Sequence, residues 1–136
     1  MSAGSLQGMS ARMAVIASFR DLTVWRKAIA LGETAYALTL LLPRDQQYEL
    51  AGQIRRAAAS VPANIAEGHN RHARRAYANH IAIALGSLAE LESHVELANR
   101  LGLVDPAQAR QLLAQADEVN RMLHALARAL SAPRRE

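Results

Sequence analysis

The chain has 136 residues, a net charge of +4 and no cysteine. This length suits one domain with a single core. The absence of cysteine excludes disulfides and thiolate metal sites, and the chain start lacks a signal-peptide pattern, so we expect a cytoplasmic protein. No apolar run reaches the roughly 20 residues that a membrane span needs. We expect residues 1–18 and 132–136 to be tails around a folded unit over 19–131.

Two helical patterns occupy the first half of the chain. Over 22–42, apolar side chains recur at every third or fourth position, which is the period of one helix face. Asp21 is the expected N-cap of this helix, and Pro43 is expected to end it. A second pattern covers 50–65, and Gly68 follows where a left-handed C-terminal cap is favoured.

Two further patterns occupy the second half. The pattern over 77–98, followed by Gly102, predicts a helix of about 29 residues and about 43 Å. Asp105 and Pro106 then form a cap and a first-turn proline, and they introduce a fourth stripe over 109–130. No stretch alternates with period two, so the sequence predicts an all-α, up-down four-helix bundle. The apolar stripes are broad, which fits either a wide core or self-association.

The net charge is concentrated in one stretch. Positions 54–75 hold five arginines and one glutamate, whereas the 11 basic and 11 acidic residues elsewhere cancel. Three explanations fit this surplus: a solvated basic face, a contact with acidic residues of a neighbouring copy, or a site for phosphate. The acids available for a subunit contact lie in the second half of the third helix. The residues concerned are Arg55, Arg56, Arg71, Arg74, Arg75 and Glu67, with Glu90, Glu92 and Glu96 as the acids.

Charged residues at the turn between the second and third predicted helices oppose the helix dipoles. Glu67 lies at a helix C-terminus, and the arginines at 71, 74 and 75 lie at the next helix N-terminus; each mismatch costs roughly 0.3–1 kcal/mol when exposed. We expect Glu67 to bridge to Arg71 or Arg74 and so to restrain the turn. One carboxylate cannot neutralise three arginines, so a positive surplus remains.

Pro62 and Asn64 lie inside the second helix. Pro62 has no N–H to donate to the carbonyl of Ala58, so we expect a kink there. The kink either fits the curvature of the bundle, which we favour, or positions Asn64 and Glu67. The Asn64 amide needs polar partners on an apolar turn, so we expect it to form hydrogen bonds across helices.

Signals for an enzyme or a metal site are weak. His69 and His72, with His80 farther along, lack a third ligand at a zinc spacing, so we interpret them as turn histidines. Ser60 has no base nearby in the sequence, and no glycine-rich loop could hold a phosphate. We therefore predict no catalytic residue, no metal ligand and no cofactor.

Three segments resemble a known family: FRDLTVW over 19–25, QIRRAAASVPANIAEG over 53–68 and GSLAELESHVELANRLG over 86–102. They are similar to the four-helix-bundle proteins of the 23S rRNA intervening-sequence family. The resemblance implies assembly as a homopentameric ring. It also implies kinship with the accessory variability determinant of diversity-generating retroelements, a basic pentamer that binds nucleic acid and a reverse transcriptase.

The family pattern falls on the same turn. Its paired arginines fall on Arg55 and Arg56, its kink on Pro62, its Asn-Ile-Ala-Glu-Gly turn on 64–68, and a further arginine on Arg71. The chain departs from this pattern where the family has a capping box and a polar helix position. The capping-box positions are Ala73 and Ala76 here, and the polar helix position is Leu85. Asn70 is therefore the expected substitute cap.

These observations lead to one expectation and one alternative. We expect a non-enzymatic homo-oligomer whose five arginines bind RNA or DNA backbone, as an accessory to a reverse transcriptase if the kinship extends that far. The alternative is an interaction scaffold that does not bind nucleic acid, in which the arginines contact acids of the next subunit.

Overall fold

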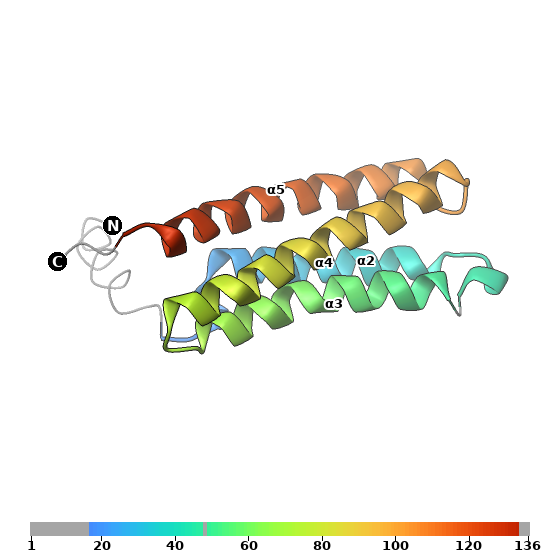
Figure 1. The fold of residues 1–136 in the computed structure, drawn as a ribbon. Helices are drawn as coiled ribbons and strands as arrows, with labels where there is room; N and C mark the ends of the chain where they lie inside the picture. The colour runs from blue at the N-terminus through green and yellow to red at the C-terminus, as the bar shows by residue number, and fades with distance from the viewer. Residues whose placement is uncertain (1–16, 48, 134–136) are drawn as a thin grey trace, which may run out of the picture.

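Four long helices run alternately up and down in the computed structural model, which describes residues 17–47 and 49–133 (Figure 1). They are α2 (Thr23–Leu40), α3 (Leu50–His69), α4 (Arg74–Arg100) and α5 (Pro106–Ser131), with short 3-10 turns η1 (Phe19–Asp21) and η2 (Arg44–Gln46). Each helix packs on the next in chain order, and α5 returns to α2. The predicted all-α bundle is confirmed. No described helix is long and apolar enough to cross a membrane.

The predicted apolar stripes form a single core. Leucine, isoleucine and valine side chains from all four helices are fully buried, and alanines on α3 and α4 let these two helices approach closely. Such interiors pack as densely as organic crystals, so small side chains set the spacing of the helices. The largest buried side chains are Leu31, Leu38, Ile54, Val61, Ile65, Ile81, Leu88, Leu91, Val95, Leu112, Val119 and Leu123.

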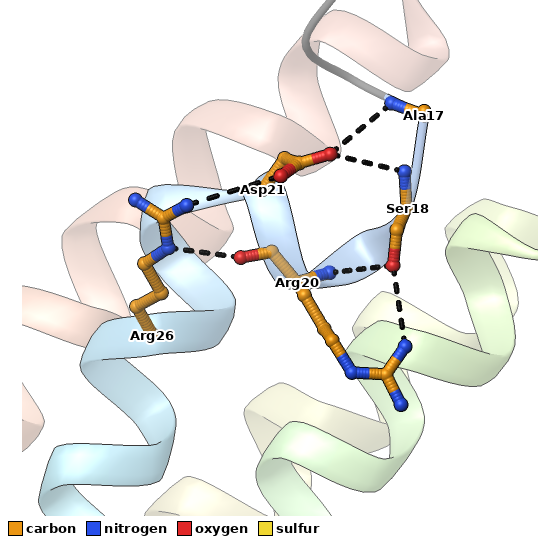
Figure 2. A network of polar contacts seen from close by, with 5 residues as sticks. All are labelled: Ala17, Ser18, Arg20, Asp21 and Arg26. Carbon is orange, nitrogen blue, oxygen red and sulfur yellow. Dashed lines mark hydrogen bonds and ion pairs between the residues drawn. The ribbon is translucent and has the colours of Figure 1, made fainter.

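The chain enters the bundle through η1, so the prediction that Asp21 caps the first helix was wrong. The N-cap of α2 is Leu22, which makes no side-chain cap bond. The Asp21 carboxylate instead points back and accepts hydrogen bonds of 3.2 Å from the backbone N–H groups of Ala17 and Ser18 (Figure 2). Ser18 in turn accepts from the N–H of Arg20, which completes a capping box around η1. Residues 1–16 of the predicted tail lie outside the described residues.

Gly68 does not form the predicted left-handed cap. Helix α3 continues through Gly68, and Asn70 takes the C-cap in a right-handed conformation. Among the described glycines only Gly102 has a positive φ, of 72°, and it follows α4 where expected. Gly68 is buried, and a Cβ built on it would lie 2.9 Å from Cδ1 of Tyr77 and from Cβ of His80. Gly68 therefore serves the close approach of α3 to α4.

The remaining helix ends differ less from expectation. Helix α4 begins after Ala73, which makes no side-chain cap bond, so Asn70 does not cap it as predicted. Asp105 occupies the N-cap position of α5 without a side-chain cap bond, and Pro106 is the first helical residue, as predicted. Helix α3 remains one helix through Pro62, which is buried.

Candidate nucleic-acid interface

The up-down topology gathers basic residues from three separate segments at one end of the molecule. The start of α2, the turn between α3 and α4, and the end of α5 all lie at this end (Figure 1). Within three residues of the helix ends and in the connecting turns, six arginines and two acids leave a surplus of four positive charges there, whereas the opposite end has two basic and three acidic residues. We call this the basic end, and it comprises Arg20, Arg26, Arg71, Arg74, Arg75 and Arg128 with Asp21 and Glu67. The opposite end holds Arg44, Arg100, Asp45, Glu49 and Asp105.

Arg20, Arg26 and Arg128 had no place in the sequence-based site. The predicted topology was the signal that could have found them, because alternating helices bring these segments together. Nε of Arg26 donates to the carbonyl of Arg20 at 2.8 Å, and its Nη2 lies 3.9 Å from the Asp21 carboxylate (Figure 2). The guanidinium of Arg20 lies 4.5 Å above the ring of Phe19. Turn η1 therefore holds two arginines at the basic end.

Glu67 restrains the turn by a local ion pair. Its carboxylate lies 3.8 Å from Nη2 of Arg71, one helical turn along the chain, and both side chains are about half exposed. The predicted bridge from Glu67 to Arg71 is confirmed. An exposed pair of this kind contributes at most about 1 kcal/mol to stability. Its larger effect is to hold the Arg71 guanidinium beside the turn.

Arg74 and Arg75 have different surroundings although they are adjacent. Nη2 of Arg74 donates to the carbonyls of Ala129 at 2.6 Å and Ala132 at 3.3 Å. Ala129 lies in the last turn of α5, whose carbonyls lack partners within the helix, and Ala132 is the C-cap residue, so a cation is favourable there. Arg75 is exposed to solvent. The turn therefore presents Arg71 and Arg75, and Arg74 ties α4 to the end of α5.

The other two predicted arginines lie away from the turn. At 1.5 Å per residue, Arg55 and Arg56 are about 20 Å from the end of α3. Nε of Arg55 donates to Thr39 Oγ1 at 2.8 Å, and its guanidinium lies 5.3 Å from the ring of Tyr36. The five predicted arginines thus form two groups, one at the basic end and one in the first half of α3.

Arg56 lies on the side of α3 that faces α4. A Cβ built on Gly52 would lie 3.2 Å from Nη1 of Arg56, so this side chain folds back along the helix. With Gln53, Glu90 and His94 it lines a polar recess of about 420 Å³ between α3 and α4.

A line of polar contacts joins α3 to α4. Nδ2 of Asn64 donates to the carbonyl of Ser60 at 2.9 Å, and Oδ1 of Asn64 lies 3.1 Å from Nδ1 of His80. The hydroxyls of Ser60 and Ser87 are 2.7 Å apart. The predicted cross-helix bonding of Asn64 is confirmed. His69 packs edge-on against Tyr77, with ring centroids 5.9 Å apart. Within residues 17–47 and 49–133, no three potential metal ligands cluster.

An apolar groove of about 510 Å³ runs between α2 and α3 on the outside of the bundle. Small side chains of α3 form its floor, and larger side chains of α2 form its wall. We call it the α2–α3 groove, and its lining residues are Trp25, Ile29, Gly32, Glu33, Tyr36, Ala58, Ala59, Pro62, Ala63 and Ala66.

The fold and these surfaces define a class of protein: an up-down four-helix bundle with one basic end and an apolar groove. The model of the family described as 23S rRNA-intervening sequence protein matches residues 20–125. The chain belongs to that family.

A crystal structure described as a protein with unknown function from the S23 ribosomal protein family of Bacteroides thetaiotaomicron VPI-5482 has the same fold. The two chains are 24% identical, with a TM-score of 0.72 over 77% of this chain and 98% of that one. At this identity the likeness concerns the fold alone. None of the curated proteins compared with the chain matches it.

Proposed function

We propose that the protein binds the backbone of RNA or DNA through its basic end, in the cytoplasm and without catalysing a reaction. The observation that carries this proposal is the surplus of four positive charges gathered at one end from three segments, while the other end carries one net negative charge. The planar arginine fork matches phosphate, and counterion release adds affinity. Arg71, Arg75 and Arg128 are exposed and provide the first contacts, with Arg55 and Arg56 farther along α3. The family's link to rRNA genes supports an RNA ligand.

Recognition should depend on charge more than on sequence. Stacking of unpaired bases needs exposed aromatic side chains. Near the turn, Tyr77 is half-buried, and burial raises the pKa of its hydroxyl. Phe19 packs edge-on against Trp25 at 5.2 Å. Neither ring offers a free stacking surface, so the ligand is expected to be held by its phosphates.

The protein is also proposed to act as a homo-oligomer, a pentamer if the family resemblance extends to assembly. Exposed large apolar side chains support association, since such patches on soluble proteins mark interaction sites. A role as accessory to a reverse transcriptase rests on the same resemblance. A reverse-transcriptase gene beside the gene for this protein would support that role.

A charge-reversal experiment tests nucleic-acid binding. The double variant Arg71→Glu/Arg128→Glu changes two exposed arginines on different elements of the basic end. Fluorescence anisotropy with labelled single- and double-stranded RNA and DNA should show salt-sensitive binding of the wild type, and loss of most of it in the variant. The slope of log K against log salt should become shallower by about 0.7–0.9 for every phosphate that the variant no longer neutralises.

The matched control is Arg44→Glu/Arg100→Glu, which changes the net charge equally at the opposite end. It should keep most of the wild-type affinity. Equal affinity of the wild type and Arg71→Glu/Arg128→Glu at low salt would contradict the proposal.

The second candidate is an interaction scaffold without nucleic-acid affinity, which the α2–α3 groove favours. In that case the arginines would pair with Glu90, Glu92 and Glu96 of the next subunit. The wild type would then bind no probe, and reversing Arg71 and Arg128 would dissociate the oligomer. Light scattering of both proteins, together with the anisotropy, separates the two candidates.

A further inference from the structure

Beyond Arg74 and Arg75, the first half of α4 has an outer surface without charge. Residues 76–89 are fourteen positions that contain no Asp, Glu, Lys or Arg. The outer surface of a helix in a soluble monomer normally carries charged and polar side chains. Here the exposed side chains are small or apolar apart from the amide of Asn79, and Ile83 projects with 51% of its surface exposed. We call it the α4 face, and it comprises Ala82, Ile83, Gly86 and Ala89.

Among the described residues that line it, the α2–α3 groove carries a single charged side chain, that of Glu33 on α2. Residues 57–66 of α3 are ten positions without Asp, Glu, Lys or Arg. The outer surface of α5 differs, because it exposes charged side chains along its length: Arg110, Asp117, Arg121 and Arg128. Depletion of charge is characteristic of interface cores.

The groove and the α4 face lie at the same level along the bundle. At 1.5 Å per residue, the α3 side of the groove, from Ala66 to Ala58, lies about 5–17 Å from the end of α3. Ile83 lies about 14 Å from the start of α4. Because the α3–α4 turn joins those two ends, Ile83 is level with the groove.

Charges of opposite sign bound the α4 face and the groove. At the turn, Arg75 precedes the α4 face and Glu67 follows the groove, both within about 3 Å of the helix ends. At the far limit, Glu90 follows the α4 face at about 24 Å, and Arg55 lies beside the groove at about 21 Å. Two copies side by side at the same level would therefore place Arg75 opposite Glu67, which also pairs with Arg71 of its own copy, and Glu90 opposite Arg55. In such an assembly Arg71 and Arg128 remain outside the subunit contact and available to phosphate.

We propose that the α4 face of one copy packs into the α2–α3 groove of the next, with Ile83 entering the groove. This inference rests on the proposed homo-oligomer and assigns its contact surfaces. The alanines and Pro62 on the floor leave room for the Ile83 side chain, while Trp25 and Tyr36 flank it. The occupant is a second copy of this chain because the charges at both limits of the groove complement those of the α4 face.

This contact closes copies into a ring. Two different surfaces meet, so the interface is heterologous. The groove and the α4 face lie on neighbouring sides of the bundle, since the helices pack in chain order, and each copy is therefore rotated relative to the last. The surfaces share one level, so no shift along the bundle accompanies the rotation. Such a rotation gives a closed ring when a whole number of copies completes the turn, whereas a shift along the bundle would give a filament.

A complementation experiment tests this interface. Ile83→Asp disables the α4 face and leaves the groove intact, whereas Ala63→Asp disables the groove and leaves the α4 face intact. Each places an unpaired charge in the contact. By light scattering we expect a ring for the wild type and monomers for each variant alone. An equimolar mixture should form a dimer and nothing larger, because only one intact contact remains.

The single tryptophan gives a second readout. Trp25 is the only tryptophan of the chain and lines the groove. Its emission maximum should lie at longer wavelength in the variants and shift back when they are mixed. Ala125→Asp, an exposed position on α5, is the matched control and should keep the wild-type mass. Circular dichroism verifies that every variant is folded.

Several outcomes would overturn the inference: a monomeric wild type, wild-type mass in either variant, or a mixture that stays monomeric. None of them decides whether the protein binds nucleic acid. That function is tested by Arg71→Glu/Arg128→Glu, and both of those positions lie outside the groove and the α4 face.

Discussion

At the scale of single residues, Gly68 illustrates how one position can have two explanations. A glycine at the end of a helical pattern is typical of a left-handed cap, because glycine adopts positive φ without strain. In the structure Gly68 is helical, and α4 lies against its Cα. The missing side chain is needed because Tyr77 and His80 occupy the space where a Cβ would lie.

Gly68→Ala is expected to destabilise the protein by about 1–3 kcal/mol, the usual cost of inserting a methyl group into a packed interior. Gly52→Ala on the same helix is the control. Its Cβ would meet only the flexible end of Arg56, so the better helix propensity of alanine should add about 0.5–1 kcal/mol. Urea unfolding followed by circular dichroism measures both. Equal urea midpoints for the two variants would show that a methyl group at position 68 causes no steric destabilisation against α4.

At the scale of helices, the contact between α4 and α5 carries like charges. Burial raises the pKa of the Glu92 carboxyl, and the charges of Asp117 and Glu96 raise it further. Asp117 lies on α5 and forms an ion pair with Arg121. On the other side of α4, the polar pairs Ser60–Ser87 and Asn64–His80 and the close approach at Gly68 join it to α3. The α4–α5 contact is therefore sensitive to pH.

Glu92→Gln is expected to change how stability depends on pH. Because the pKa of Glu92 is raised in the folded state, the folded protein binds this proton more tightly than the unfolded chain does. Protonated Glu92 therefore stabilises the folded state relative to the unfolded chain below its unfolded pKa, near 4.5. This stabilisation is lost as pH rises through the folded pKa of Glu92. The variant should therefore be more stable than the wild type at pH 7 and similar below about pH 4. The urea midpoints of variant and wild type are measured across this pH range. Parallel profiles of midpoint against pH for the two proteins would contradict the expectation.

At the scale of the whole molecule, the basic end and the proposed ring are connected. A ring without axial shift places the basic end of every copy on the same face. A ligand long enough to reach two basic ends then binds the second one at a high effective concentration. Assembly is thus proposed to strengthen binding without any new type of contact.

Ile83→Asp is expected to weaken binding of long RNA more than binding of short RNA. A probe of about 8 nucleotides reaches roughly one basic end, and one of about 40 nucleotides can reach several, so only the longer probe should lose avidity, by tenfold or more. Anisotropy titrations at fixed salt measure both affinities. An equal loss for the two probes would indicate that the substitution damages the basic end itself.

The sequence by itself determined the number of helices, their approximate limits and the local ion pair at the turn. These features depend on residues a few positions apart: the three- and four-residue apolar spacing, Gly102 after α4, Pro106 at the start of α5, and the Glu67–Arg71 pair. Contacts of this range are set by helix geometry, so a pattern along the chain is sufficient to predict them.

Only the tertiary structure decided which residues share the basic end and which are already occupied. Arg20, Arg26 and Arg128 join the turn because antiparallel packing brings distant segments together. Arg74 is engaged by α5, 55 residues away from it at Ala129, and Gly68 is a contact point because α4 lies against it. Each of these facts depends on residues far apart in the sequence, whose meeting is fixed by the packing of whole helices and leaves no periodic signal along the chain.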